Sequence, residues 1–256
     1  MQSFSGAGSS NLKEAYLEAK KNSPTYRVML EKYISGPQLS TESLIIDSKS
    51  YTIGLSDRNY DLLDTYSPFI IENGGDLPAS LNDIQKKKVN IIIDKVAKSL
   101  NIKNGVIKGD IVFEPDSDDP IIIEVATRLS GGYFCSHEIP LSTGVDFLGA
   151  AIKLAIGDKI NINSIYPTEN NFVSQRYLFA EEGVVKTIPD IEEIKKMEGI
   201  KLAVLRAKIG DKIYSAKSHP GRAGLVIATG KSRNNAIINA SNAINRMQKN
   251  LLTSRK

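Results

Sequence analysis

The sequence predicts an α+β fold, in which helices and strands follow one another along the chain. Residues 109–128 have the alternation and the turn of a β-hairpin, whereas residues 80–100 and 145–156 have the apolar spacing of helices. No internal repeat of fixed period interrupts this pattern. With 256 residues, 41% of them hydrophobic, the chain is long enough for one large or two smaller cores.

The first segment is rich in small residues and leads into a predicted helix. Residues 3–11 read SFSGAGSSN, and Asn11 is the expected N-cap. The apolar stripe of that helix comprises Leu12, Ala15, Tyr16 and Ala19. Exposed backbone N–H groups at a helix N-terminus suit a phosphate. Without support from elsewhere, however, a disordered or tag-like N-terminus explains this composition better.

The next segment is expected to be extended and then to form a hairpin. Residues 27–38 are a largely apolar run that breaks at Gly36-Pro37. Two short strands follow at residues 41–47 and 51–55, and residues 48–50 are expected to join them.

Two helices are predicted in the middle of the chain. Ser80 and Asp83 resemble a capping box that opens a helix ending near Leu100. The inward stripe of this helix is expected at Leu81, Ile84, Ile92, Val96 and Leu100. A second, apolar helix over residues 145–156 stops at Gly157, because glycine readily supplies the left-handed residue that ends a helix.

The hairpin at residues 109–128 places two acids opposite each other. Its turn is the segment PDSDDP, and pairing that is symmetric about Ser117 sets Asp110 against Glu124. The side chains expected on the same face are Glu114, Ala126 and Arg128, and those on the other face are Ile111, Phe113, Ile123 and Val125. Facing carboxylates repel each other, so a divalent cation between them would explain the pair. A solvated face with an accidental acidic pair explains the hairpin equally well.

The remainder of the chain reads as a linker, short strands and a last helix. Residues 158–171 resemble a linker, and strands are expected near residues 173–179, 201–208 and 225–229. Gly210-Asp211 and residues 221–224 read as turns. The final helix begins near Ser232, and one of its faces carries Ala236, Ala240, Ala243, Ile244 and Met247.

Five segments together resemble the ATP-binding half of an ATP-grasp enzyme. In order, they are the glycine-rich start, EKYISGPQLSTES, GDIVFE, IIIEVATRLSGG and STGVDFLGAAIKLAIGD. The agreement lies in their order and approximate spacing, and it continues into the C-terminal segment. The resemblance implies an ATP-grasp fold, with residues 1–160 as a nucleotide- and metal-binding domain that is incomplete at its N-terminus. Residues 161–256 would form the smaller α+β lobe that closes the site.

The resemblance also implies positions that hold ATP. The loop over the phosphates would include Ser5, Gly6, Gly8 and Ser9. The hinge that reads adenine through its backbone would comprise Glu31, Lys32, Tyr33 and Ile34. Gln38 matches the position that contacts ribose, which is more usually Glu. A Gln can still bond a hydroxyl there, but it brings no charge, so the nucleotide affinity can differ.

Metal and catalytic roles follow from the same resemblance. Asp110 and Glu124 match the family's magnesium carboxylates, and Mn²⁺ could replace Mg²⁺. Arg128 matches the arginine near the transferred phosphate. Ala126 stands where an Asn is common, which predicts that one magnesium site is weaker or is completed by water.

Substrate contacts are expected at two short segments. Asp57 and Arg58 lie in a neighbourhood that approaches substrate or phosphate in similar enzymes, although a surface ion pair is an equal alternative. The loop formed by Ser130, Gly131 and Gly132 would let backbone approach an acyl phosphate, and we favour this over a simple turn because it directly follows the metal strand.

The implied chemistry is ATP-dependent ligation of a small carboxylate to an amine through an acyl phosphate. Such phosphoryl transfer needs alignment and charge neutralisation rather than a protein nucleophile. A biotin-dependent carboxylase is a second possibility, but those enzymes carry an acidic, histidine-bearing run where this chain has LSGGYF after Arg128. A nucleotide-binding module without activity is the third. Cys135 and His137 do not form a nucleophile–base pair by their spacing, and a chain with one Cys and two His is not expected to hold zinc.

Further expectations concern the partners and the compartment. Similar enzymes carry a phosphate-binding Lys and a substrate domain before the glycine-rich loop, so the sequence predicts a piece of a longer enzyme or a companion chain, and weak activity alone. Exposed apolar surface would then favour a homo-oligomer. A net charge of +4 does not indicate nucleic-acid binding. With no apolar run that could span a bilayer and no signal segment, a cytoplasmic location without membrane contact is expected.

Overall fold

The protein is built on one large antiparallel sheet, which confirms the predicted α+β class. The computed structural model describes residues 9–66, 69–214 and 221–254. Eight strands lie in the order β5-β4-β1-β2-β3-β6-β10-β8. Their bounds are β1 Gln38–Ile46, β2 Lys49–Asn59, β3 Gly74–Leu77, β4 Gly105–Phe113, β5 Pro120–Ala126, β6 Phe172–Leu178, β8 Ile200–Leu205 and β10 Gly224–Gly230. A small second sheet comprises β11 (Leu252–Ser254), β7 (Gly183–Thr187) and β9 (Lys212–Ile213).

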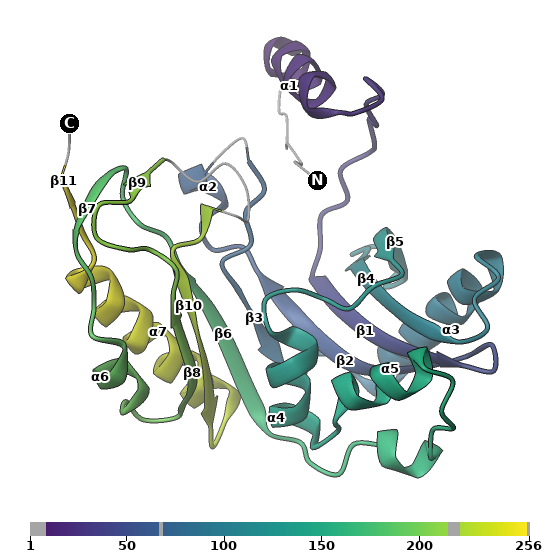
Figure 1. Cartoon of the computed structure of the whole chain (residues 1–256). Helices are drawn as coiled ribbons and strands as arrows, with labels where there is room; N and C mark the ends of the chain where they lie inside the picture. Colours follow the sequence, from purple (N-terminus) through teal and green to yellow (C-terminus); the bar gives the residue numbers. More distant parts are fainter. Residues whose placement is uncertain (1–8, 67–68, 215–220, 255–256) are drawn as a thin grey trace.

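Helices cover both faces of the large sheet (Figure 1). The helices are α1 Ser9–Asn22, α2 Leu63–Tyr66, α3 Asp83–Ser99, the π-helix η1 Phe134–Glu138, α4 Ile139–Thr143, α5 Phe147–Ala155, the 3-10 helix η2 Ile162–Ile165, α6 Ile191–Lys195 and α7 Arg233–Asn250. Among the helices in these described ranges, none has the length and apolar content that crossing a membrane requires.

The two faces of the sheet carry different cores. On one face, α3 packs its Ile93 against Leu39 and Ile111, and α7 packs its Ala240 against Val226. On the other face, η1, α4 and α5 pack against side chains such as Leu44 and Leu225. We call this second face the site face, because it also carries Asp110. Neighbouring residues of a strand point to opposite faces of the sheet. The polar side chains that meet on the site face therefore come from alternate positions of each strand.

The acidic hairpin has the predicted pairing at its centre. Asp110 lies opposite Glu124, but the register shifts directly after this pair, and Ile111 then faces Ile122. Ile123 is the extra residue of this bulge and is 46% exposed, so the prediction that it shares a packed face with Ile111 and Phe113 is wrong. The first hairpin, β1-β2, is also confirmed. Its turn is Asp47-Ser48 rather than residues 48–50, and both residues have positive φ, as in a tight hairpin turn.

The helix predictions are confirmed in position and corrected in detail. Helix α3 is capped by Asn82 with Gln85, not by Ser80 with Asp83. Its buried residues are Val89, Ile93 and Ala97, so the buried stripe is shifted by one residue from the predicted positions Ile92 and Val96. Ile84 and Leu100, at the ends of the predicted stripe, are exposed. Helix α1 begins at Ser9, so Asn11 lies inside it and is not its N-cap. The cap of α7 at Ser232, its alanine face and the left-handed Gly157 after α5 are as predicted.

The predicted boundary near residue 160 lies between α5 and β6. Strand β3, from the first part of the chain, pairs with β6 from the second, so the sheet continues across this boundary. The division into two domains remains a prediction. The continuous sheet places side chains from both parts on the site face.

Candidate functional site

Asp110 is the centre of a cluster of charged side chains on the site face. Arg58 Nη1 lies 2.9 Å from Asp110 Oδ1, and Lys108 forms a second ion pair with the same carboxylate. Ser40 Oγ donates to Asp110 at 3.4 Å. The register explains this convergence, because Ser40 pairs with Asp110 on one side and with Ser56 on the other, and Arg58 is two residues further along β2. All four side chains therefore share one face.

Asp110 and Glu124 are cross-strand partners, and carboxylate oxygens are ligands that a hard divalent cation prefers. Across the residues that the structure describes, no group of three or more His, Cys, Asp or Glu side chains could hold a metal ion. A metal at this pair would therefore take its remaining ligands from water or from a bound substrate. Mg²⁺ is commonly held in this way, by one or two carboxylates together with phosphate oxygens. Ala126, which pairs with Lys108, supplies no further oxygen.

A second arginine adds positive charge beside Arg58. The Arg222 guanidinium carbon lies 3.5 Å from the centre of the Tyr177 ring, and its Nη2 donates to the Glu72 carbonyl at 2.7 Å. The Glu72 carboxylate in turn bonds Arg58 Nη2 at 2.7 Å. Both arginine side chains are about nine-tenths buried, and the Nε of each is buried without a hydrogen-bond partner among the described residues. Two cations with spare donors can bind an anion.

The loop at residues 128–132 lies against the same face. Arg128 is exposed, and its Nη1 donates to the Leu129 carbonyl at 3.1 Å. Ser130 N–H donates to both carboxylate oxygens of Glu42, each at 3.1 Å. Gly132 has a φ of +69°, and a Cβ there would lie 2.4 Å from Tyr177 Oη. Glycine is therefore needed for the loop to lie against Tyr177.

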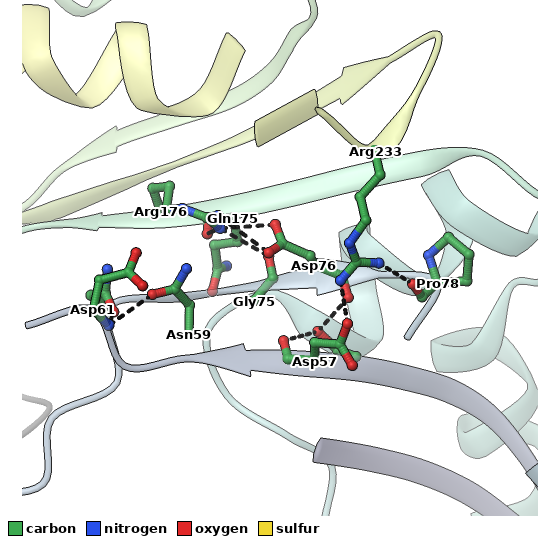
Figure 2. A network of polar contacts seen from close by, with 11 residues as sticks. Asp57, Asn59, Asp61, Gly75, Asp76, Pro78, Gln175, Arg176 and Arg233 are labelled. Carbon is green, nitrogen blue, oxygen red and sulfur yellow. Dashed lines mark hydrogen bonds and ion pairs between the residues drawn. The ribbon is translucent and has the colours of Figure 1, made fainter. Parts of the chain in front are cut away.

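Asp57 and Arg58 do not act together, because they point to opposite faces. Asp57 forms an ion pair with Arg233 at the start of α7 (Figure 2). It also accepts the Ser80 N–H at 3.0 Å. Figure 2 also shows Asp76 bonded to Arg176 in the same network. Of this predicted substrate pair, only Arg58 lies beside Asp110. Asp57 instead links β2 to α7 through its ion pair with Arg233.

The predicted nucleotide-binding residues lie before β1. Ser5, Gly6 and Gly8 are outside the described residues, and Ser9 is the first residue of α1. The hinge residues Glu31, Lys32, Tyr33 and Ile34 form part of the extended stretch that joins α1 to β1. Figure 1 shows α1 and this stretch standing away from the sheet. Gln38 begins β1 and pairs with Val112 of β4, so it lies next to the strand that carries Asp110.

Several charged residues of this face were not among the predicted site residues. Lys108 could have been found, because it is two residues before Asp110 and so shares its face. Glu42 and Glu72 carried no comparable signal, because only the strand order brings them to this face. Arg222 was interpreted as part of a turn, whereas it stacks on Tyr177.

Two models of known families match the chain. The family model described as "Carbamoyl-phosphate synthase L chain, ATP binding domain" matches residues 6–163, which is more than half of the chain. The chain belongs to this family. A second model, "L-amino acid ligase C-terminal domain 2", matches residues 176–250. The two matches follow each other along the chain, and residues 164–175 separate them.

Solved structures show that this member of the carbamoyl-phosphate synthase ATP-binding family has the predicted ATP-grasp fold. The chain is similar to the L-amino acid ligase from Bacillus licheniformis, with a TM-score of 0.74, 18% identity, and coverage of 87% of this chain and 55% of the ligase. For phosphoribosylglycinamide synthetase from Anaerococcus prevotii the TM-score is 0.73 at 14% identity, with coverage of 96% and 61%.

The chain is shorter than the proteins it resembles. It is 25% identical over 210 residues to the uncharacterized protein y4rH of Sinorhizobium fredii (strain NBRC 101917 / NGR234). This alignment covers 82% of this chain and 41% of y4rH. It also resembles the biotin carboxylase domain of Hydrogenobacter thermophilus 2-oxoglutarate carboxylase, solved with MgADP and bicarbonate, with a TM-score of 0.66, 18% identity, and coverage of 91% and 50%. The chain thus spans about half the length of these relatives.

Proposed function

We propose that the chain binds Mg·ATP on the site face and contributes to an ATP-dependent ligase that joins a carboxylate to an amine. The observation that carries this proposal is the Asp110–Glu124 pair, which faces across two strands of an ATP-binding family member. The activity of the whole enzyme is part of the proposal, because the chain covers only part of its relatives.

The charged residues and the glycine loop of the site face have distinct roles in this proposal. Asp110 and Glu124 would hold Mg²⁺, or Mn²⁺ in its place, and the metal would neutralise charge on the phosphate oxygens. Arg128 would offset the negative charge of the transferred group. Arg58 and Arg222 would bind the carboxylate of the acid substrate, because each has an unused buried donor. The glycines of residues 130–132 would let the acyl phosphate approach backbone.

The nucleotide itself would lie along the start of β1. In this proposal Gln38 contacts the ribose, and the backbone of residues 31–34 reads the adenine. The phosphate loop would comprise Ser5, Gly6, Gly8 and Ser9. Support for these roles comes from the family match, which covers all of these positions except Ser5.

The exposed apolar side chains before β1 support a further part of the proposal. Those at least 45% exposed in this region are Leu12, Tyr16, Leu17, Tyr26, Met29, Leu30 and Tyr33. Such a concentration of apolar surface is typical of a covered interface. We propose that another polypeptide packs there, which is either a companion chain carrying the rest of the ligase or a second copy of this chain.

The experiment that tests the proposal is calorimetric titration of the whole chain with ATP in the presence of Mg²⁺. Asp110→Asn and Glu124→Gln should each weaken Mg·ATP binding by more than about tenfold, because each removes a charged metal ligand. Glu114→Gln is the matched control, since Glu114 follows β4 in the same hairpin and its side chain accepts a hydrogen bond from Ser117 Oγ. Equal affinity for all four proteins would refute the metal site.

Turnover distinguishes the ligase from its alternatives. ADP release should be measured with Mg·ATP and a panel of carboxylates and amines. Slow release that rises when both substrates are present supports the ligase. Release that needs bicarbonate instead supports the carboxylase alternative, and binding without release supports a nucleotide-binding module.

A further inference from the structure

Glu42 is a fully buried acid in the middle of the sheet. It lies in β1, with Gly54 of β2 and Lys108 of β4 as its cross-strand neighbours. Gly54 leaves the space that this side chain needs, because a Cβ there would lie 3.0 Å from Glu42 Cβ and 2.4 Å from Ile139 Cδ1. Burial of a carboxylate costs free energy unless specific partners compensate for it. The partners of Glu42 therefore indicate its role.

The hydrogen-bond partner of Glu42 is the backbone of the loop that follows Arg128. Ser130 N–H donates to both carboxylate oxygens at 3.1 Å. At the other end of the loop, Gln175 of β6 donates to the Gly132 carbonyl. Side chains from β1 and β6 thus hold residues 130–132 at both ends. This restraint matters because Tyr133, directly after the loop, has left-handed backbone with φ of +70°, which costs free energy in a residue other than glycine.

The charges around Glu42 allow its carboxyl group to ionise near neutral pH. Burial raises the pKa of Glu42 and outweighs the lowering by the Ser130 hydrogen bonds, Lys108 and Arg128, so that the pKa is about 7. From η1, the Cys135 thiol also faces this region, and its pKa is raised to about 11 by burial and by the Glu42 charge. Gly54 of β2 and Ile139 of α4 bring no charge. The bond to Ser130 is therefore charge-assisted when Glu42 is ionised.

We propose that Glu42 is a positioning residue for the phosphates, because its carboxylate fixes residues 128–132 so that Arg128 faces the group held beside Asp110 and Glu124. This inference rests on the function proposed above. Glu42 itself is buried beneath the loop and touches neither nucleotide nor metal. It acts through Ser130, and loss of its charge loosens the loop without removing any group that contacts substrate.

The test combines wild type with Glu42→Gln, which keeps the shape and one acceptor oxygen but removes the charge. In the wild-type chain, the amide proton resonance of Ser130 should titrate with a midpoint near the pKa of Glu42, about 7, and in Glu42→Gln it should not. At pH 8, Glu42→Gln should bind Mg·ATP about fivefold more weakly, since a charge-assisted bond becomes a neutral one. Its unfolding temperature should not fall, because a buried charge is removed.

Ser43→Ala is the matched control on the same strand. Ser43 is fully buried and bonds Thr52 Oγ1 at 2.9 Å, away from the loop. This variant should lose stability but keep the wild-type affinity for Mg·ATP.

Two results overturn the inference: equal Mg·ATP affinity of wild type and Glu42→Gln, or a Ser130 resonance that does not titrate in wild type. The second result needs no variant, so it stands even if Glu42→Gln fails to fold. A wild-type chain that binds no Mg·ATP is a different outcome. It refutes the proposed function, and the positioning role falls with it.

Discussion

At the scale of single residues, strand parity decides which charges reach the site. Asp57 and Arg58 are adjacent in sequence, yet Arg58 pairs with Asp110 and Asp57 pairs with Arg233 on the opposite face. The sequence predicts substrate contact for both residues, but it does not predict which face of the sheet each side chain occupies. The bulge opposite Glu42 and Ser43 has Ile53 as its extra residue and alters the alternation of side chains along β2, and nothing in the sequence marks it.

Gly132 is the glycine of the site loop whose substitution should have the largest effect. Gly132→Ala should lower the free energy of unfolding by about 1–2 kcal/mol, since it places a Cβ against Tyr177 and disfavours a positive φ. Gly131→Ala is the control, because a Cβ at Gly131 meets nothing within 4 Å. Urea denaturation measures both. Equal losses of unfolding free energy in the two variants would show that the contact with Tyr177 does not constrain position 132.

Glu42 predicts a pH dependence of stability. Its pKa is raised in the folded state from the ordinary value of 4.5, so the stability it contributes is present below pH 4.5 and is lost as pH rises through about 7. From pH 5 to pH 8, wild type should therefore lose up to about 3 kcal/mol relative to Glu42→Gln. Urea denaturation of both proteins at the two pH values measures this. If the difference in unfolding free energy between the two proteins is the same at both pH values, Glu42 is not a buried acid with a raised pKa.

At the scale of elements, the turn of the acidic hairpin predicted the pairing at its centre, but the strand register shifts next to that pair. Symmetry about Ser117 gave Asp110 opposite Glu124, which the structure confirms. The bulge at Ile123 could not be predicted, because the alternation of apolar residues in PIIIEVA fits either register. Similarly, the helical period located α3, but Asn82 caps it in place of Ser80, since both residues are good caps.

The contact between α7 and β2 should affect stability without affecting the site. Asp57→Asn weakens the ion pair with Arg233 and should lower the free energy of unfolding by about 1–2 kcal/mol. Its Mg·ATP affinity should match wild type, because Asp57 lies on the other face. Glu193→Gln, which breaks the exposed pair with Lys196, is the control and should leave stability unchanged. A large loss of nucleotide affinity in Asp57→Asn would instead assign Asp57 to the site.

At the scale of the whole molecule, the candidate site depends on the order of the strands. Glu42, Arg58, Glu72, Asp110 and Arg222 come from distant parts of the sequence, and the sheet order β4-β1-β2-β3-β6-β10 brings their strands and loops together. The resemblance to ATP-grasp enzymes predicted the fold and the metal pair from local motifs. It could not predict Glu42, Glu72 or Arg222, because no local pattern marks a residue that acts only through tertiary contacts.

The central claim is that Asp110 and Glu124 jointly hold a divalent cation that carries nucleotide phosphates. Anomalous diffraction from a crystal of the whole chain grown with ATP and Mn²⁺ tests it most directly. The account predicts a manganese peak within metal–ligand distance of both carboxylates and of a phosphate oxygen, with Arg58 moved away from Asp110. An ordered nucleotide whose manganese lies elsewhere, with the Arg58–Asp110 pair intact, would contradict it.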